Sequence, residues 1–453
     1  MQHTADQTRS RAIVVFLATA VGSTFEQYDF LIYGMSSALF FNKLFFPTVS
    51  PAVGALAAIG IYSVGYCARP LGGVLCGHFG DRLGRKTLLL LTFLVMGMAT
   101  VLIGCMPVYA DIGIAAPLGL ILLRFIQGIA IGGEHTGSGV FAVENAPPGR
   151  RGLYGTWPAM GIFAGALLAT SALGLAEAIS GDAFLAWGWR LPFLASVLLL
   201  GLGTVLRAKL PESPAFKSVL EKHAVAEVPA ATVLRDYPGQ TILVMLCRIG
   251  EIGWGMILAI IGAGYITGQL GLPRSVYLHA VQISAVASIA SLWLTGLLSD
   301  RFGRKPVYIA GAFMAAVLAF PFFWLLDTNV AVLIILAMVL GDALAHAPMA
   351  GMQQSFFSEL YPSRVRYSGV AIGQQVGAAI GGGILPPIFA GLLAWSGGAP
   401  WPVAAFMIVI AAITILAVCA TPETRGRDLT HIDDPMAETG ILPVGQIAPN
   451  LLR

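Results

Sequence analysis

The chain has 453 residues, of which 57% are hydrophobic and only 11% are charged. Soluble domains carry roughly 25% charged residues, so this composition excludes an ordinary soluble enzyme and indicates a chain that lies in lipid. A formal net charge of +3 indicates no particular partner, and we expect no nucleic acid. The five cysteines fall in apolar runs with the spacing of neither a zinc site nor a disulfide framework, so we expect no metal and no cofactor.

Apolar runs separated by polar turns predict an all-α membrane protein with twelve transmembrane helices. A helix needs about 20 apolar residues to cross the hydrocarbon core of a bilayer. The first run follows a short polar N-terminus and is too long for a signal peptide. The predicted spans are 13–40, 52–77, 87–107, 113–143, 153–178, 190–208, 239–268, 276–298, 305–326, 330–357, 367–395 and 401–420.

One polar stretch, residues 77–86 (Gly-His-Phe-Gly-Asp-Arg-Leu-Gly-Arg-Lys), lies between two of these runs. Asp-Arg-X-Gly-Arg-Lys occurs again at residues 300–305, and no compositional bias produces such a repeat. We predict a tight polar turn at each copy. The Asp would cap a neighbouring helix end and the Arg residues would bridge two halves in one conformation. The candidate gating residues are Asp81, Arg82, Gly84, Arg85, Asp300, Arg301 and Arg304.

Three matches in the same order indicate a duplicated six-helix unit. Asp81 recurs as Asp300, Glu144 as Glu359, and Pro211-Glu212 as Pro422-Glu423, at offsets of 219, 215 and 211 residues. Parallel repeats of this kind suggest a transporter whose halves move about a central site. The predicted organisation is an N-terminus at 1–11, a first bundle at 12–208, a linker at 209–238, a second bundle at 239–420 and a tail at 421–453.

Basic residues indicate the orientation of the twelve helices. Of the 26 Lys and Arg residues, 20 fall on the side that carries the termini, 3 on the opposite side and 3 inside helices. Because basic residues favour the cytoplasmic side, both termini are predicted to be cytoplasmic.

Ionisable residues inside membrane helices are costly and are functional candidates by default. Glu26, Asp29 and Tyr33 share one face of the first helix, and we place Arg124, Gln127 and Glu134 on one face of the fourth. A buried carboxylate beside an Arg stays ionised and takes a proton when the Arg moves away, as a proton symporter requires. The alternative is a permanent ion pair that only holds helices together. Glu134 could instead bind substrate or bond to a neighbouring helix.

Other intramembrane charges have two interpretations each. Arg69 could bind substrate or extend to the nearby membrane surface. Arg248 could anchor a substrate carboxylate or form a structural pair with Glu251. Asp342 and His346 could be a titrating pair or a core histidine with its partner. The candidate substrate-binding residues are Glu26, Tyr28, Tyr33, Arg69, Gln127, Arg248, Glu251, Trp254, His346, Gln353 and Gln375.

These motifs resemble the major facilitator superfamily, and within it the metabolite:proton symporter family. Further matches are residues 25–30 (Phe-Glu-Gln-Tyr-Asp-Phe), 69–73 (Arg-Pro-Leu-Gly-Gly), 132–134 (Gly-Gly-Glu) and 210–213 (Leu-Pro-Glu-Ser). The branch that it most resembles is that of the shikimate transporters, from which it departs at Gln27 and His135-Thr136. The resemblance implies two pseudo-symmetric bundles. It also implies that Asp29 and Arg124 are paired coupling residues. Glu134 is a further coupling candidate, because it is a carboxylate inside the membrane and could relay protons.

The resemblance further implies a monomer in the bacterial cytoplasmic membrane that imports a small organic acid with protons by alternating access. Another metabolite class, such as a di- or tricarboxylate or a betaine-like solute, is the alternative. A membrane enzyme would need a metal cluster, a nucleophile triad or a cofactor motif, and the sequence has none of these. A transporter-like sensor usually has an added signalling domain, for which a tail of 33 residues is short. The tail also lacks heptads, which disfavours the osmosensing betaine and proline branch of the family.

Overall fold

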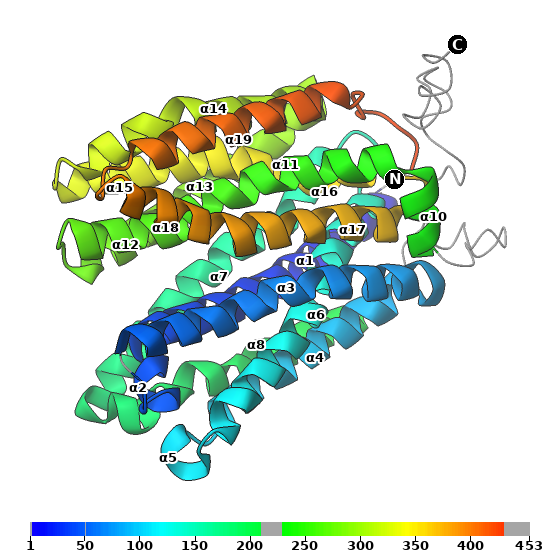
Figure 1. Ribbon diagram of the computed structural model, residues 1–453. Coiled ribbons are helices and arrows are strands. Elements are labelled where there is room, and N and C mark those ends of the chain that lie inside the picture. The colour runs from blue at the N-terminus through cyan, green and yellow to red at the C-terminus, as the bar shows by residue number, and fades with distance from the viewer. Residues whose placement is uncertain (1, 50, 210–228, 430–453) are drawn as a thin grey trace.

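The computed structural model describes residues 2–49, 51–209 and 229–429, and every regular element within these ranges is a helix. Ten helical segments are long and apolar enough to cross a membrane, and α1 and α3 complete the twelve of the predicted fold. Figure 1 shows the helices running side by side in two bundles, one formed by the first half of the chain and one by the second.

The first bundle contains the helices α1 (Gln2–Ser36), α3 (Pro51–Leu83), α4 (Arg85–Cys105), α6 (Ala115–Glu144), α7 (Arg151–Ser180) and α8 (Arg190–Ala208). Short elements at the helix ends are η1 (Ser37–Phe41), α2 (Asn42–Phe45), α5 (Tyr109–Ile112), η2 (Gly181–Ala183) and η3 (Phe184–Gly188).

In the second bundle, several membrane helices contain a stretch of π-helix. They are α11 (Pro238–Met256) with η4 (Ile257–Ile261), α12 (Gly262–Gly264) and η5 (Tyr265–Gln269); α13 (Arg274–Phe302); α14 (Arg304–Leu326); α15 (Ala331–Leu340) with η6 (Gly341–His346) and α16 (Ala347–Ser358); α17 (Arg366–Ala379) with η7 (Ile380–Ile384) and α18 (Leu385–Trp395); and α19 (Trp401–Ala420). The predicted spans agree with these helices to within a few residues at most ends.

Two predictions about polar segments need correction. Residues 77–83 are the last two turns of α3, so the predicted polar turn is confined to Gly84, whose φ of 108° favours glycine. Gly303, with a φ of 106°, separates α13 from α14 in the same way. The predicted linker ends in a helix, α10 (Pro229–Asp236), which packs against α3 and α17. Pro211 and Glu212 lie outside the described residues.

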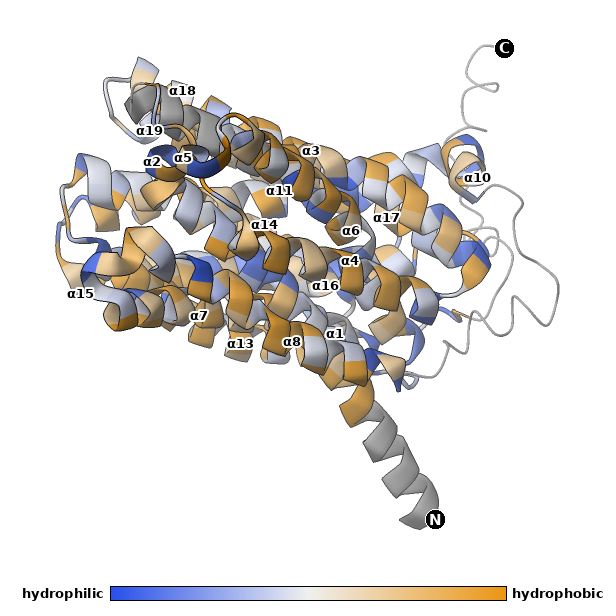
Figure 2. Ribbon diagram, turned by 90° about the horizontal axis from the view of Figure 1, so that it is seen from below, coloured by the Kyte–Doolittle hydropathy of each residue, from blue (hydrophilic) through white to orange (hydrophobic). Residues whose placement is uncertain are grey.

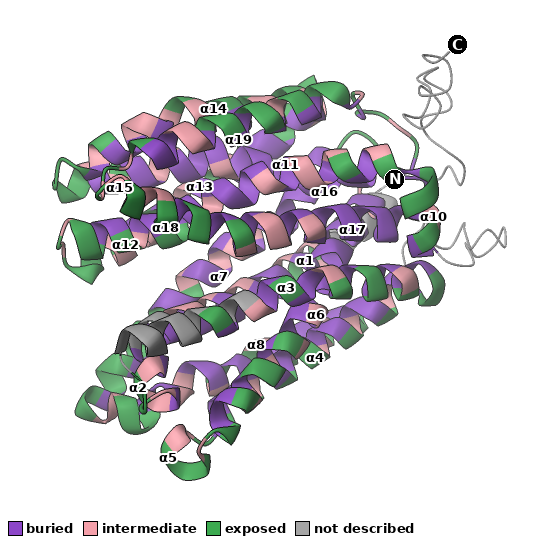
Figure 3. Ribbon diagram, in the orientation of Figure 1, coloured by how far each residue is buried: buried purple, intermediate pink, exposed green. Residues whose placement is uncertain are grey.

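The side-chain pattern fits a bundle in lipid. Figure 2 shows apolar residues along the helices and hydrophilic residues gathered toward their ends. Figure 3 shows buried residues where helices meet and exposed residues on the outer faces. Aromatic rings fill the core of the first bundle, where Phe41, Trp189 and Phe193 pack together. Large apolar side chains such as Leu198 and Trp324 point outward, as expected for helices that face acyl chains.

The two bundles meet through helix pairs that the duplication relates to each other. Helix α3 packs against α17, and α7 packs against α13. We call the end of the molecule that carries the two Asp-Arg-X-Gly-Arg-Lys motifs the motif side. At the motif side, Asp81 of α3 accepts hydrogen bonds from the backbone N–H groups of Tyr367 (3.4 Å) and Ser368 (2.9 Å), which are the second and third residues of α17.

Asp300 makes the same contact in the opposite direction. Its carboxylate accepts from the backbone N–H groups of Gly152 (2.7 Å) and Leu153 (3.0 Å), the second and third residues of α7. Each motif aspartate therefore caps a helix of the other bundle, as the sequence predicted. Free N–H groups and the helix dipole favour a carboxylate at these positions.

Candidate functional site

A cavity of about 170 Å³ lies between the two bundles. Both bundles contribute ionisable side chains to its wall, among apolar residues such as Phe163 and Met256. Five of the predicted substrate-binding residues line the cavity, together with four ionisable residues that were not in that set. The predicted residues are Glu26, Arg69, Arg248, Glu251 and His346, and the others are Tyr66, His135, Tyr277 and Asp342.

Arg69 lies on the cavity wall and does not extend to the membrane surface. The residue is 5% exposed, and its guanidinium carbon stands 4.4 Å from the ring centre of Tyr66 and 4.9 Å from that of Phe30. Its Nε has no hydrogen-bond partner, and no described carboxylate forms an ion pair with it. The two rings hold a cation in the cavity that no acidic side chain neutralises at close range.

The opposite wall holds a connected row of charged groups. Arg248 pairs with Glu251 at 2.8 Å and donates to Gln353 at 2.5 Å. Glu251 lies 3.1 Å from His346, and His346 lies 2.9 Å from Asp342. Ser284 of α13 donates to Asp342 at 2.9 Å. Because each group is held by a neighbour of complementary charge or polarity, this row can stay charged inside the bundle.

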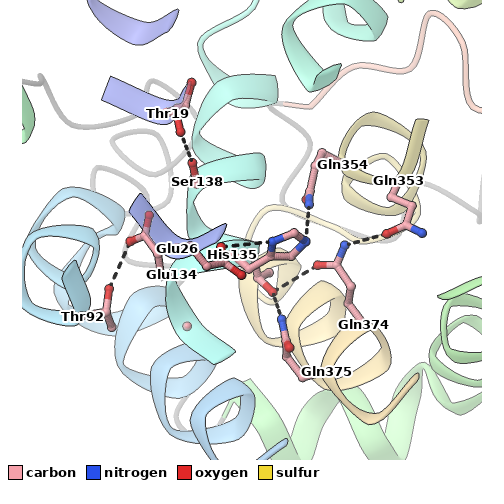
Figure 4. A network of polar contacts seen from close by, with 12 residues as sticks. Thr19, Glu26, Thr92, Glu134, His135, Ser138, Gln353, Gln354, Gln374 and Gln375 are labelled. Atoms are coloured by element: carbon pink, nitrogen blue, oxygen red, sulfur yellow. Dashed lines mark hydrogen bonds and ion pairs between the residues drawn. The ribbon is translucent and has the colours of Figure 1, made fainter. Parts of the chain in front are cut away.

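His135 connects this row to the first bundle. Its Nδ1 lies 3.3 Å from Glu26, and its Nε2 lies 3.4 Å from both Arg248 and Gln354. Figure 4 shows the imidazole between Glu26 on one side and the glutamines of the second bundle on the other. His135 therefore touches the two bundles at once. The sequence singled out His135 only as a departure from the related branch and assigned it no contact.

A layer of amide side chains lies beside His135 (Figure 4). Thr136 donates to Gln374 and accepts from Gln375, both at 3.2 Å, and Gln374 donates to Gln353 at 3.3 Å. We call His135, Thr136, Gln354, Gln374 and Gln375 the amide layer. Gln354 follows the cavity residue Ala350 along α16 toward Glu359 at the motif side. The amide layer thus separates the cavity from the motif side.

Asp29 and Arg124 are paired inside the first bundle, as the resemblance implied. Their charged groups are 3.5 Å apart and both residues are fully buried. Thr100 donates to the same carboxylate at 2.7 Å, and Gln127 donates to it at 2.9 Å. The guanidinium of Arg124 also lies 4.7 Å from the Phe30 ring, which separates it from Arg69. The ion pair is therefore one aromatic ring away from the cavity wall.

Glu134 pairs with a cation of another helix. Its carboxylate forms a bidentate ion pair with Arg207 of α8, whose guanidinium lies over the Phe93 ring. Thr92 also lies within hydrogen-bond distance of Glu134, at 3.4 Å. This contact agrees with the alternative in which Glu134 bonds to a neighbouring helix. Arg207 is buried, and a buried carboxylate needs such a cation beside it, but the sequence did not indicate which cation this would be.

Six predicted substrate-binding residues lie outside the cavity lining. Tyr28 donates to the carbonyl of Pro192 at 2.7 Å, and Trp254 donates to that of Gly341 at 2.7 Å. Arg124 covers the Tyr33 ring, and Gln127 is bonded to Asp29. Gln353 bonds to Arg248, and Gln375 belongs to the amide layer. Most of these residues form hydrogen bonds that hold the helices together. Spacing along a helix does not distinguish such a structural residue from one that lines the cavity.

The motif side is closed by two buried charge clusters. In one, Arg85 lies 3.0 Å from Asp81 and 3.5 Å from Glu144, and Arg366 of the second bundle lies 2.9 Å from Glu144. In the other, Arg304 lies 2.9 Å from Asp300 and 3.1 Å from Glu359. Arg82 and Arg301 have no contact with the opposite bundle that the structure records; Arg82 lies beside His78, and Arg301 lies over Phe302.

Comparison with known proteins gives consistent similarities. The sequence profile of the sugar (and other) transporter family matches residues 15–241 and again residues 221–435. The shikimate transporter of Escherichia coli K12 is 38% identical over 413 residues, which cover 90% of this chain and 94% of that protein. The proline/betaine transporter of Salmonella typhimurium is 34% identical over 429 residues, with 91% and 84% of the two chains covered.

Solved structures of a proton:xylose symporter have the same fold. The form bound to 6-bromo-6-deoxy-D-glucose superposes with a TM-score of 0.77 at 20% identity, over 94% of this chain and 99% of that one. An inward-open form superposes with a TM-score of 0.63 at 18% identity, over 93% and 99% of the two chains.

Proposed function

Since this chain belongs to the sugar (and other) transporter family of the major facilitator superfamily, we propose that it imports a small hydroxylated monocarboxylate together with protons. Its relatives are transporters, and the chain is likewise a multi-pass inner-membrane transporter and not an enzyme.

The observation that carries the proposed substrate class is the charge pattern of the cavity. Arg69 offers one guanidinium that no acidic side chain neutralises at close range, and its planar fork suits a carboxylate. Glu26, Glu251 and Asp342 also place carboxylate oxygens on the wall, and Glu26 lies near enough to Arg69 for their charges to attract each other. Those oxygens accept hydrogen bonds from hydroxyl groups and repel a second carboxylate. A ring or chain with one carboxylate and several hydroxyl groups matches both features.

The same geometry disfavours a betaine-like solute. A quaternary ammonium group binds best against open aromatic faces. Phe30 and Tyr66 are the aromatic rings that flank Arg69, and its guanidinium already occupies a face of each. Similarity to a shikimate transporter supports the proposed substrate class, because shikimate is a ring with one carboxylate and three hydroxyl groups.

Proton coupling is assigned to Asp29 in this proposal. Asp29 and Arg124 are fully buried, and Arg124 touches the ring of Phe30 that faces the cavity. Substrate binding at Arg69 would disturb Phe30 and so the distance between Arg124 and Asp29. Separation of the pair in a dry environment favours the neutral acid, and reunion releases the proton. Glu134 is the second candidate for the coupling site.

Counterflow and uptake into liposomes driven by a pH gradient test the proposal. The panel is shikimate, quinate, protocatechuate, 2-oxoglutarate, citrate and betaine. Accumulation of a hydroxylated monocarboxylate, abolished by a protonophore, is the expected result. Accumulation of citrate or betaine alone would contradict the charge argument.

A reporter fused after Arg453 should be active only in its cytoplasmic form, since the motif side is assigned to the cytoplasm.

A further inference from the structure

His135 faces two hydrogen-bond donors with one nitrogen and an acid with the other. The guanidinium of Arg248 has only donors, and the amide nitrogen of Gln354 is also a donor. Both lie 3.4 Å from Nε2, so Nε2 must be the acceptor. Nδ1 then carries the hydrogen and donates to Glu26 at 3.3 Å. The observed contact between the bundles therefore requires a neutral imidazole with its proton on Nδ1.

A second proton on His135 would remove this arrangement. Gln354 could adapt by turning its amide, because its Oε1 is buried against Gly139 with no hydrogen-bond partner. Arg248 could not adapt, since it has no acceptor and keeps its charge at any relevant pH. Two cations 3.4 Å apart in a buried site repel strongly. Protonation of His135 therefore weakens the contact between α6 and α11.

Charged groups of both signs lie around His135. Glu26 from α1 favours the imidazolium, and Arg69 from α3 and Arg248 from α11 oppose it. Glu251, also from α11, is held by Arg248. Glu134, the preceding residue, is neutralised by Arg207 from α8. The residue of α16 that contacts His135 is the amide Gln354, and the amides of α17 contact the next residue, Thr136. A small displacement of Arg248 would favour the protonated state.

The location of His135 makes it accessible to protons from the cavity and places it where a repulsion can affect the contact between the bundles. His135 lines the cavity, so a proton that enters the cavity can reach it. It is also part of the amide layer, which the two bundles must break if they separate at the motif side. We propose that His135 is a proton-operated contact between the bundles: when neutral it accepts from Arg248 and Gln354 and keeps the amide layer closed, and when protonated it releases Arg248 and lets the motif side open.

This inference rests on the proposed function only for the statement that the motif side is cytoplasmic. It concerns a second proton site, distinct from Asp29, that acts on the conformation. The experiment therefore measures conformation without any substrate. A failure to transport organic acids would leave its result unchanged.

Spin labels at Leu83 and Phe302 report the separation of the bundles at the motif side. These residues end α3 and α13 and are 62% and 58% exposed. The exposed Cys67, Cys105 and Cys419 are first replaced so that only the labelled sites react. Distance distributions are then recorded from pH 8 to pH 5 on the full-length protein in lipid nanodiscs.

The decisive variant is His135→Gln, which can accept from Arg248 and donate to Glu26 but cannot take a proton. A site whose proton affinity differs tenfold between two states changes their ratio by up to about tenfold over its titration. We expect about this increase in the long-distance population for the parent protein and less than about a twofold increase for His135→Gln. His279→Gln, which removes an exposed imidazole of α13, should behave as the parent does.

Two results would overturn the proposal. One is a pH response of His135→Gln equal to that of the parent, and the other is a parent protein whose distances do not change with pH. His135→Asn is the second variant if His135→Gln does not fold, as judged by its elution volume. The same two comparisons then apply to it.

Discussion

At the scale of single residues, the proposed function gives Asp29 and Arg69 separate roles. Asp29 is fully buried among Arg124, Thr100 and Gln127, whereas Arg69 lies on the cavity wall. Substitutions at the two positions should therefore affect different steps of transport, coupling in one case and substrate affinity in the other.

Asp29→Asn keeps the hydrogen bonds of a neutral acid and removes the site that gives up a proton. We expect counterflow to persist and accumulation under a pH gradient to fall to the level of equilibration. Asp111→Asn, in the exposed helix α5, is the matched control and should accumulate substrate normally. If Asp29→Asn still concentrates substrate, the coupling site lies elsewhere, and Glu134 is then the position to test.

Arg69→Lys keeps the positive charge but loses the bidentate fork and the planar contact with Tyr66. The apparent KM for the transported acid should rise about tenfold, which corresponds to about 1.4 kcal/mol of binding free energy. Initial-rate measurements on equal amounts of membrane protein check this value. Arg235→Lys, at an exposed position outside the cavity, should leave KM unchanged. An unaltered KM for Arg69→Lys would indicate that Arg248, and not Arg69, binds the substrate carboxylate.

The sequence indicated the buried charges and some of their pairs, such as Asp29 with Arg124 and Arg248 with Glu251, but it did not indicate the partners of Glu134 and His135 on distant helices. Polar residues in apolar helices are visible in any sequence, and Asp29, Arg69, Arg248 and Glu251 were all found in this way. Which charge meets which depends on helix rotation and packing. Glu134 pairs with Arg207, 73 residues away, and His135 meets Arg248, 113 residues away. No periodicity within one helix contains that information.

At the scale of helices and turns, the capping of α14 shows how the segment after α19 is held. Glu423 accepts from the backbone N–H groups of Arg304 (2.8 Å) and Lys305 (3.1 Å), the first two residues of α14. Partial burial opposes the charge, but these donors and the N–H groups of Thr424 and Arg425 outweigh it and lower the pKa of Glu423. A carboxylate is therefore favoured at this helix start.

Glu423→Gln should lower the thermal midpoint at pH 7 by a small amount, equivalent to about 0.5–1 kcal/mol for a partly exposed cap. A lowered folded-state pKa stabilises the protein above the pKa of the unfolded chain, and this contribution is lost as the pH falls through the folded-state pKa. The difference between parent and variant should therefore shrink as the pH is lowered toward 4 and below. Thermal unfolding in detergent at several pH values measures it. A difference that is constant with pH would exclude an ionised cap.

The helices themselves were predictable from sequence, because long apolar runs leave little choice of structure in lipid. Their ends at the motif side were not. Residues 77–83 carry charged side chains and were interpreted as a turn, yet they continue α3. Asp81 and Arg85 remain buried there because the opposite bundle supplies partners, the backbone of α17 and the carbonyl of Ser363. Local polarity cannot reveal a partner from the other half of the chain.

At the scale of the whole molecule, the two crossed caps hold the bundles together at the motif side. Asp81 and Asp300 are equivalent by duplication and contact equivalent residues of α17 and α7. The duplication was visible from three matched motifs, and it correctly indicated two related bundles. The central cavity between them followed from the same reasoning, although six of its proposed residues lie elsewhere.

Asp81→Ala and Asp300→Ala should shift the conformational equilibrium by similar amounts. Loss of a helix cap costs about 1 kcal/mol, so each variant should increase the population that is open at the motif side by about fivefold. The distance between labels at Leu83 and Phe302 measures this population at one fixed pH. A shift for one variant and none for the other would show that the two caps are not equivalent in the closed state.

The crossed caps also bear on which substitutions this interface tolerates. The hydrogen bonds that each aspartate accepts from the other bundle come from backbone N–H groups, so the identity of the capped residue contributes little to the bond. Leu153 could be exchanged for many residues without loss of its hydrogen bond to Asp300, but proline has no N–H to donate. A saturation library at position 153 should therefore be depleted of proline, while position 300 itself should accept almost nothing but Asp. The interface would thus tolerate few substitutions at the capping aspartate and many at the residues whose N–H groups it accepts from.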